Sequence, residues 1–149
     1  LLHRPGIAEI DMGEYLSILT QSLSAAMEQE ITLRVDSDPI KLSIDRAVPC
    51  ALVVNELVSN SATHAFPGRE AGTVWITLRR RDGDVVLTIR DNGVGIDETN
   101  IEAYDSVGML LIRTLVAQLE GSVSLESEGG TVVSIRFAPE SPPARGTET

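Results

Sequence analysis

Several features that would restrict the choice of fold or location are missing from this sequence. A single cysteine, Cys50, occurs among the 149 residues, so no disulfide can form within the chain. There is no run of about 18 or more apolar residues, and no succession of charged, apolar and small residues at the N-terminus. We therefore expect neither a membrane span nor a signal peptide, and no membrane contact by this segment.

Positive charge is also scarce. The chain has 12 basic residues against 22 acidic ones, which gives a formal net charge of −10. Non-specific binding to nucleic acid needs a positive field, so we expect no nucleic-acid partner. An anionic ligand remains compatible with this charge if backbone amides and a metal ion neutralise it locally.

Hydrophobic residues make up 42% of the chain, which is enough for one domain with a buried core. The first residue is Leu rather than Met, which suggests a fragment. Residues 1–10 are interpreted as an irregular leader, and residues 139–149, which lack apolar periodicity, as a disordered tail. The folded domain is therefore expected over residues 11–138. Cys50 has apolar neighbours and is expected to be a buried structural thiol.

Apolar periodicity predicts the secondary structure between these ends. Asp11 is predicted to cap a first helix, and Asp45 a second helix with Pro49 in its early turns. The triplet Arg79–Arg81 is interpreted as a solvated sheet edge that precedes a hairpin turn at Asp82–Gly83. In chain order we predict a helix over 11–27, strands over 31–35 and 40–44, a helix over 45–66, strands over 74–78 and 85–89, a helix over 109–119 ended by Gly121, and strands over 123–125 and 133–137. This order predicts an α/β fold, a two-layer sandwich with about three helices on one face of a mixed, mostly antiparallel sheet.

The second predicted helix has an apolar stripe and a separate polar stripe. Glu56 and Asn60 are four residues apart, so they share one face of the helix. A carboxylate and a carboxamide one turn apart can hold a hydrated divalent cation, or orient a group for proton removal. Taken alone, such a pair is more often a solvated surface. The apolar stripe consists of Val54, Leu57, Val58, Ser61, Ala62 and Ala65.

A second candidate site follows the strand predicted over 85–89. Asp91 lies at the edge of the core and needs a hydrogen-bond donor to be tolerated there. The exocyclic amine of adenine is such a donor, whereas guanine offers a carbonyl at that position, so this carboxylate would select adenine. Gly93 and Gly95 would let the backbone approach a ligand closely. The alternative is an ordinary Asp-Asn-Gly hairpin turn.

The third predicted helix begins close to Ser106 and Gly108. Free amides and the positive dipole end at a helix start attract phosphate, and glycine leaves room for it. A simple serine cap is the alternative at Ser106. The polar segment over 97–106 is interpreted as a mobile cover over the ligand.

These motifs together resemble a known family. The segments ELVSNSATHAF, DNGVGI, SVGMLLIRTLVAQL and GGTVVSIRF are similar, in order and spacing, to the ATP-binding domain of bacterial sensor histidine kinases. That domain belongs to the superfamily of gyrase, MutL and a heat-shock chaperone. The Asn-Glu-Leu-Val-Ser-Asn variant and the preceding EIDMGEYL most resemble the HisKA_2 group. The resemblance covers roughly residues 9–137 and implies a Bergerat-type ATP-binding fold and a cytoplasmic location.

The resemblance implies a role for each candidate residue. Asn60 would ligate a Mg²⁺ ion that bridges the ATP phosphates, and Glu56 would act as a general base or orient the attacking group. At the base end, it implies that Asp91 accepts from the adenine amine, that Gly93 and Gly95 line the base pocket, and that Thr131 reaches adenine through a water. At the phosphate end, it implies that Ser106 and Gly108 face the phosphates. His64 would lie near the phosphates or pack in the core.

The function implied is that of a protein histidine kinase of a two-component system. It would transfer the γ-phosphate of Mg-ATP to a histidine on an adjacent helical domain of the same protein, with a response regulator downstream and a parent protein that could be a homodimer. The leader would then follow a missing dimerisation and phosphoacceptor segment. Thr63 stands where a phosphate-contacting lysine is common, and Ser106 where a glycine is common. These departures leave two alternatives open, a nucleotide-sensing module with little turnover and an anti-sigma-type serine kinase.

Overall fold

The computed structural model describes residues 8–27, 30–66, 71–95 and 107–140. Along the chain they form β1 (Glu9–Asp11), α1 (Met12–Ala26), β2 (Glu30–Ser37), β3 (Lys41–Ser43), α2 (Ile44–His64), β4 (Ala71–Arg81), β5 (Asp84–Asp91), α4 (Val107–Gln118), β6 (Ser122–Ser127) and β7 (Thr131–Phe137). The predicted order of helices and strands is confirmed, with β1 as an additional strand. In these four ranges, no helix is both long and apolar enough to cross a lipid bilayer.

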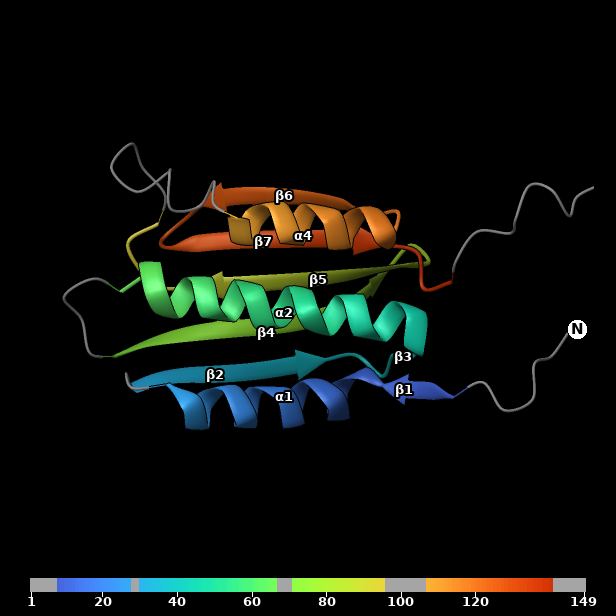
Figure 1. The fold of residues 1–149 in the computed structure, drawn as a ribbon, viewed down its shortest axis with the longest axis horizontal. Helices are drawn as coiled ribbons and strands as arrows, with labels where there is room; N and C mark the ends of the chain where they lie inside the picture. The colour runs from blue at the N-terminus through green and yellow to red at the C-terminus, as the bar shows by residue number, and fades with distance from the viewer. Residues whose placement is uncertain (1–7, 28–29, 67–70, 96–106, 141–149) are drawn as a thin grey trace, which may run out of the picture.

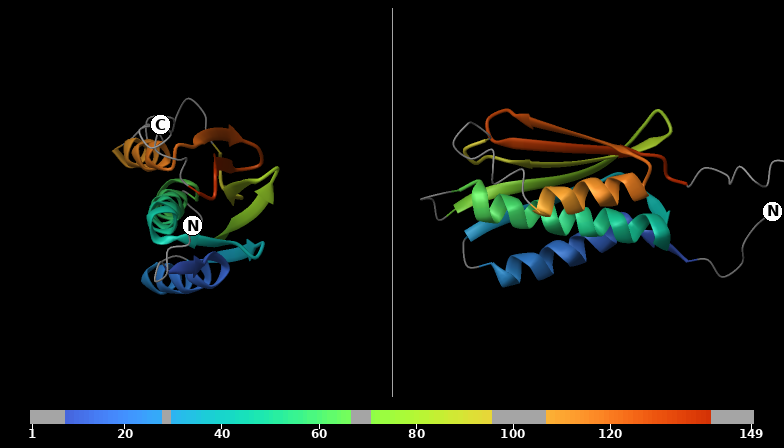
Figure 2. Two further views of the ribbon diagram at one scale, coloured as in Figure 1. Left: turned by 90° about the vertical axis from the view of Figure 1, so that its right-hand side faces the viewer. Right: turned by 45° about the horizontal axis from the view of Figure 1, so that its top comes forward.

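Five strands form one mixed sheet in the order β2-β4-β5-β7-β6. β2 pairs with β4 in parallel, and the other neighbours in this sheet are antiparallel. α1, α2 and α4 run along the sheet with α2 in the middle (Figure 1). The end-on view shows that all three helices lie on the same face of the sheet (Figure 2). The predicted two-layer α/β sandwich is therefore confirmed, and no described helix covers the opposite face of the sheet.

The core lies between the sheet and the helices. The predicted apolar stripe of α2 is confirmed, because all its residues are buried except Ala62, which is partly buried against the core. Alternation along the central strands supplies the other side of this core, with Val74 and Ile76 fully buried. Cys50 is also fully buried, and burial raises the pKa of its thiol to about 12. The predicted burial of this thiol is confirmed, and a thiol with so high a pKa stays protonated at neutral pH.

The predicted irregular leader is wrong at its C-terminal end. Glu9 and Ile10 belong to β1, which pairs antiparallel with β3, and Ile10 lies opposite Leu42. A strand of three residues has too few positions to show alternation, so only its distant partner identifies it. Asp11 caps α1 as predicted, and its Oδ1 accepts a hydrogen bond of 3.2 Å from the N–H of Glu14.

The predicted start of the second helix is also corrected. α2 begins at Ile44 with Ser43 at the N-cap position, so Asp45 is not the cap. Asp45 lies in the first turn, where a carboxylate interacts favourably with the positive end of the helix dipole. It accepts a hydrogen bond of 2.6 Å from the hydroxyl of Ser43. Pro49 lies inside the helix, as predicted.

Arg46 is a buried arginine that the periodicity does not predict. Only 2% of its surface is exposed. Its Nη1 donates to the carbonyl of Leu119 at 2.7 Å, and its Nη2 donates to the carbonyl of Glu140 at 3.1 Å. Leu119 directly follows α4, and the last carbonyls of a helix have no partner within the helix. Arg46 therefore joins the start of α2 to the end of α4.

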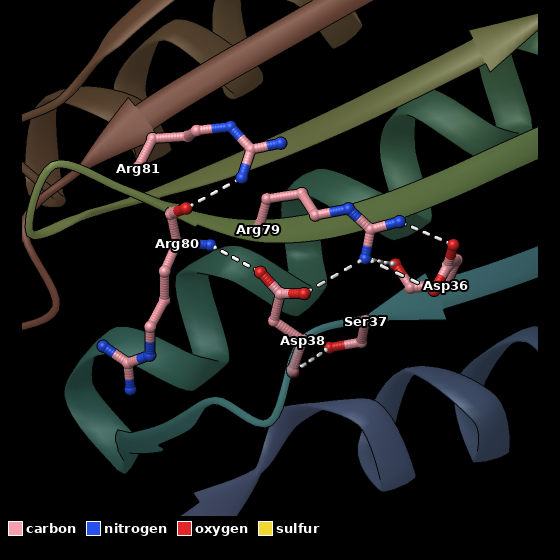
Figure 3. A network of polar contacts seen from close by, with 6 residues as sticks. All are labelled: Asp36, Ser37, Asp38, Arg79, Arg80 and Arg81. Atoms are coloured by element: carbon pink, nitrogen blue, oxygen red, sulfur yellow. Dashed lines mark hydrogen bonds and ion pairs between the residues drawn. The ribbon is translucent and has the colours of Figure 1, made fainter.

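β2 pairs with β4 only as far as Leu78, so the arginine triplet lies just beyond the end of β2. Arg79 binds the carboxylates of Asp36 and Asp38, and the backbone N–H of Arg80 donates to Asp38 at 2.9 Å (Figure 3). The guanidinium of Arg79 holds the pKa of Asp36 below its usual value. The solvated edge is confirmed for Arg80 and Arg81, which are exposed, whereas Arg79 also holds the end of β2 through these two carboxylates.

Two non-glycine residues adopt left-handed backbone conformations at turns. Asp82 has φ of 53° and is followed by Gly83 with φ of 84°, which confirms the predicted hairpin turn between β4 and β5. Glu120, with φ of 53°, holds the left-handed position after α4. The prediction that Gly121 ends this helix is therefore one residue late.

Candidate adenine and phosphate site

Asp91, the last residue of β5, is the centre of the candidate site. Only 1% of its surface is exposed. Its Oδ1 accepts from the backbone N–H groups of Gly93 and Thr131 at 3.0 and 3.1 Å, and its Oδ2 accepts from the Ser61 hydroxyl at 2.9 Å. A carboxylate has about four acceptor sites. The protein therefore satisfies Asp91 in its buried position and leaves one acceptor site, on Oδ2, for a further donor.

A narrow pocket reaches Asp91 from the helical layer. It has a volume of about 10 Å³, which is about the space of one water molecule. Three predicted site residues, Asn60 of α2, Asp91 of β5 and Thr131 of β7, share this pocket although they are far apart in the sequence. The described residues that line it are Leu57, Asn60, Ser61, Ile89, Asp91, Met109, Thr131 and Val133.

Asn60 presents an unsatisfied polar group at this pocket. Its Nδ2 is buried and has no hydrogen-bond partner among the residues that the structure describes. A buried polar atom without a partner is costly. At the wall of a pocket, a ligand or its hydration shell can remove that cost. Asn60 is therefore a residue that a polar ligand would complete.

Glu56 lies one turn before Asn60 on α2 and is partly exposed. It is not among the residues that line the pocket, and its carboxylate makes no ion pair within the described ranges. No group of three or more His, Cys, Asp or Glu residues that could hold a metal occurs in those ranges. Mg²⁺ keeps several waters and commonly takes only one or two protein oxygens besides the phosphates. The oxygens of Asn60 and Glu56 fit such a hydrated ion, whereas a dedicated all-protein cage is not formed by the described residues.

Gly93 and Gly95 approach the protein's own atoms. A Cβ atom at residue 93 would lie 2.1 Å from the carbonyl oxygen of Ala65, and one at residue 95 would lie 2.4 Å from the hydroxyl of Ser127. The N–H of Val94 also donates to Ala65 at 2.8 Å. The close approach in this structure is therefore to the end of α2 and to β6, whereas the predicted approach to a ligand stays a prediction. Neither glycine lines the pocket described above, and their effect is to fix the loop that follows Asp91.

The remaining predicted residues lie near the start of α4 or outside the described parts. Gly108 is in the first turn of α4, and the next residue, Met109, lines the pocket. The first amides of a helix have no partner within it, so this end can attract an anion. Ser106 and the predicted cover over 97–106 lie outside the described residues. The side chain of His64, the last residue of α2, also lies outside the described residues. Thr63 is exposed.

Two residues of the site were not predicted as site residues. Helical spacing alone places Ser61 in the apolar stripe, but its hydroxyl binds Asp91. A hydroxyl in a buried stripe needs a partner, and that was the available signal. Gly130 lies so close to Asp91 that a Cβ atom there would be 1.9 Å from the carbonyl oxygen of Asp91. Any side chain at residue 130 would therefore displace the backbone of Asp91 at the end of β5.

Comparison with known proteins agrees with this arrangement. Residues 45–141 match the family model described as histidine kinase-, DNA gyrase B-, and HSP90-like ATPase. The sensor histidine kinase PdtaS of Mycobacterium tuberculosis is 34% identical over 117 residues, which are 75% of this chain and 23% of that protein. The nitrate/nitrite sensor protein NarX of Escherichia coli is 29% identical over 136 residues, which are 90% of this chain and 22% of that protein. The chain thus spans about a quarter of the length of these curated relatives.

The fold is also similar to a solved structure. The histidine kinase domain of the blue-light activated histidine kinase EL346 of Erythrobacter litoralis superposes with a TM-score of 0.79 at 24% identity. The match covers 93% of this chain and 66% of that domain. The element order and the single helical layer therefore recur in a protein of low sequence identity.

Proposed function

Since this chain belongs to the histidine kinase-, DNA gyrase B-, and HSP90-like ATPase family, we propose that the pocket at Asp91 is a Mg-ATP site. We propose further that the chain is the catalytic domain of a cytoplasmic two-component sensor histidine kinase. It transfers the γ-phosphate to a histidine on an adjacent helical domain of the same protein, and a response regulator acts downstream. The observation that carries this proposal is Asp91, a buried carboxylate held by three donors of the chain in the pocket that Asn60 also lines.

The base end of the site is Asp91. Its remaining acceptor site on Oδ2 suits the exocyclic amine of adenine, which donates a hydrogen bond. A guanine carbonyl at that position would place two acceptors against each other, so guanine is rejected. Thr131 fixes the carboxylate through its backbone N–H and lines the same pocket, and we propose that it reaches adenine through a water.

The phosphate end of the site lies between α2 and the start of α4. The chain carries a formal net charge of −10, so bound phosphates need local neutralisation. Gly108 and the free amides at the start of α4 contribute part of it. A Mg²⁺ ion would supply the rest and would be held by Asn60, with Glu56 one turn away to orient the attacking histidine or accept its proton. Catalysis by this chain then consists mainly of positioning and charge stabilisation.

The first test is calorimetric titration of the chain with ATP, in Mg²⁺ and again in chelator. We expect ATP to bind in both conditions and more tightly in Mg²⁺, and GTP to bind much more weakly than ATP. Equal affinity for ATP and GTP would overturn the role of Asp91. The same ATP affinity with and without Mg²⁺ would overturn the metal site.

The second test concerns transfer. A phosphoacceptor helical segment is supplied together with ATP labelled on the γ-phosphate, and the stability of the protein-bound label in acid is measured. Acid-labile label on the segment supports the histidine kinase. ATP binding without label would instead indicate the nucleotide-sensing module, and acid-stable label on an added protein would indicate the serine kinase.

A further inference from the structure

The uncovered face of the sheet carries the only tryptophan of the chain, Trp75. Alternation along β4 turns Val74 and Ile76 towards the helices, so Trp75 and Thr77 project to the opposite face. α1, α2 and α4 all lie on the other side of the sheet (Figure 2). Trp75 is therefore a large aromatic side chain on a face that no described helix covers.

Two arginines flank this tryptophan across the sheet. Trp75 lies opposite Arg34 of β2 on one side and opposite Arg90 of β5 on the other. Paired residues of neighbouring strands are about 4.8 Å apart, so the three side chains form a row about 10 Å long. Both arginines are exposed. The row presents an aromatic ring between two positive charges.

These two arginines differ from others on the same face. Arg79 binds Asp36 and Asp38, and Arg136 binds Asp84 at 2.8 Å. Within the described ranges, Arg34 and Arg90 make no side-chain hydrogen bond or ion pair. In a chain with 22 acidic residues against 12 basic ones, two guanidinium groups on either side of Trp75 without an acidic partner are a local excess of positive charge. That excess is complementary to an anion.

A shallow cavity lies beside this row. It has a volume of about 490 Å³ and is lined by Trp75, Thr77, Thr88 and Arg90. Sites for small molecules commonly measure about 300–1,000 Å³, with mostly apolar walls and a few polar groups. The cavity thus combines a flat ring, two hydroxyl groups and a guanidinium in a volume that suits a small ligand. An acidic peptide would satisfy the charge but has no specific use for the indole.

We propose that Trp75, Arg90 and Arg34 form a second binding site, for a flat anion of the nucleoside monophosphate class. The ring of the ligand stacks on the indole of Trp75, and its phosphate binds Arg90, with Arg34 as the second cation. The site is separate from the one at Asp91. Arg90 and Asp91 are consecutive residues of β5 and therefore face opposite sides of the sheet.

The test uses guanosine monophosphate as the probe and the fluorescence of Trp75 as the reporter. Guanine is chosen because the carboxylate of Asp91 disfavours it, which keeps the two sites apart. Excitation at the red edge, where tyrosine does not absorb, makes Trp75 the only emitter. We expect saturable quenching by guanosine monophosphate, and little by guanosine or by inorganic phosphate at the same concentration. No saturable quenching, or equal quenching by phosphate alone, would overturn the proposal.

Matched variants identify the groups responsible. Arg90→Gln should weaken binding about tenfold, because a hydrogen bond to a charged group is lost, and Arg34→Gln should weaken it less. Arg80→Gln is the control, because the Arg80 side chain points away from the Arg79 guanidinium (Figure 3). Equal losses in all three variants would show general charge attraction and overturn the site. Trp75→Leu, followed by calorimetry, should remove the stacking contribution that Trp75→Phe retains.

Two further measurements separate this site from the Asp91 pocket and from a surface that binds acidic peptides. Asp91→Asn should leave the response to guanosine monophosphate unchanged, whatever its effect on ATP, so failure of the ATP proposal and failure of this one are distinguishable. A changed response in Asp91→Asn, weaker or stronger, would mean that the probe occupies the Asp91 pocket and would overturn the second site. A glutamate-rich peptide that binds through Arg90 while guanosine monophosphate does not would also overturn it, in favour of a protein partner.

Discussion

The two ends of α2 both bury polar side chains, but in different surroundings. Near its start, Arg46 is enclosed by protein and two of its nitrogens donate to backbone carbonyls. In its second half, Ser61 donates to Asp91 and Asn60 lines a pocket. In the described part of the chain, the buried side-chain nitrogens without a partner are Nε of Arg46 and Nδ2 of Asn60.

The difference lies in what can replace a missing partner. The orphan nitrogen of Arg46 belongs to a guanidinium whose other nitrogens are already engaged with the chain, so the residue acts as a structural link. The orphan nitrogen of Asn60 belongs to a side chain that lines a pocket, where a ligand can complete it. Burial of a polar group is therefore a sign of a binding site only where the group also has access to space.

The largest expected effect is on stability, from Arg46→Met. The substitution removes both hydrogen bonds to the carbonyls after α4 and β7, and we expect a loss of about 3 kcal/mol in the free energy of unfolding. Urea denaturation measures it, with the exposed Arg80→Met as a control that should stay within about 0.5 kcal/mol of the wild type. If ATP affinity of the folded protein fell as much as stability, the contrast between the two ends of α2 would be wrong.

The next largest effect is on binding, from Asp91→Asn. Asn retains Oδ1 for the two backbone N–H groups, and its Nδ2 can donate to the Ser61 hydroxyl, so stability should change little. The amide presents a donor to the adenine amine, and we expect ATP affinity to fall about tenfold to a hundredfold. Calorimetry and urea denaturation of the same sample separate the two effects. Unchanged ATP affinity would remove Asp91 from the base site.

A smaller and more selective effect is expected from Asn60→Ala. If Asn60 ligates Mg²⁺, the variant should lose most of the increase in ATP affinity that Mg²⁺ produces, and little of the affinity in chelator. Stability should be unchanged or slightly improved, because a buried nitrogen without a partner is removed. Equal losses of affinity in Mg²⁺ and in chelator would contradict the metal role.

The smallest effect is expected at the surface, from Asp36→Asn. Arg79 lowers the pKa of Asp36, so this pair stabilises the fold above the unfolded-state value and its contribution disappears as pH falls through the lowered value. Asp36 is exposed, and solvent keeps the contribution small. Thermal unfolding should therefore show the wild type slightly more stable than the variant at neutral pH, with the gap closing in acid. A stability difference that widened in acid would contradict the expected direction of this pH dependence.

Much of the fold could be predicted because its signals are local. The apolar stripe of α2, the alternation in β4 and β5, and the turn at Asp82–Gly83 each depend on residues close together in the sequence. The errors occur where a distant partner decides. β1 exists through β3, Arg79 is held by Asp36 and Asp38 at the end of β2, and Arg46 is buried because α4 ends beside it.

The candidate site shows the same division. Asp91, Asn60 and Thr131 could be named from residue type and spacing, whereas Ser61 and Gly130 could not, since their roles depend on where Asp91 lies. By itself the sequence determined the helices, most of the strands and the chemical groups available, because periodicity and residue type act within a few turns or one strand. Only the tertiary structure decided which groups meet, because the pocket joins α2, β5, α4 and β7, and the row of Arg34, Trp75 and Arg90 depends on strand order and register.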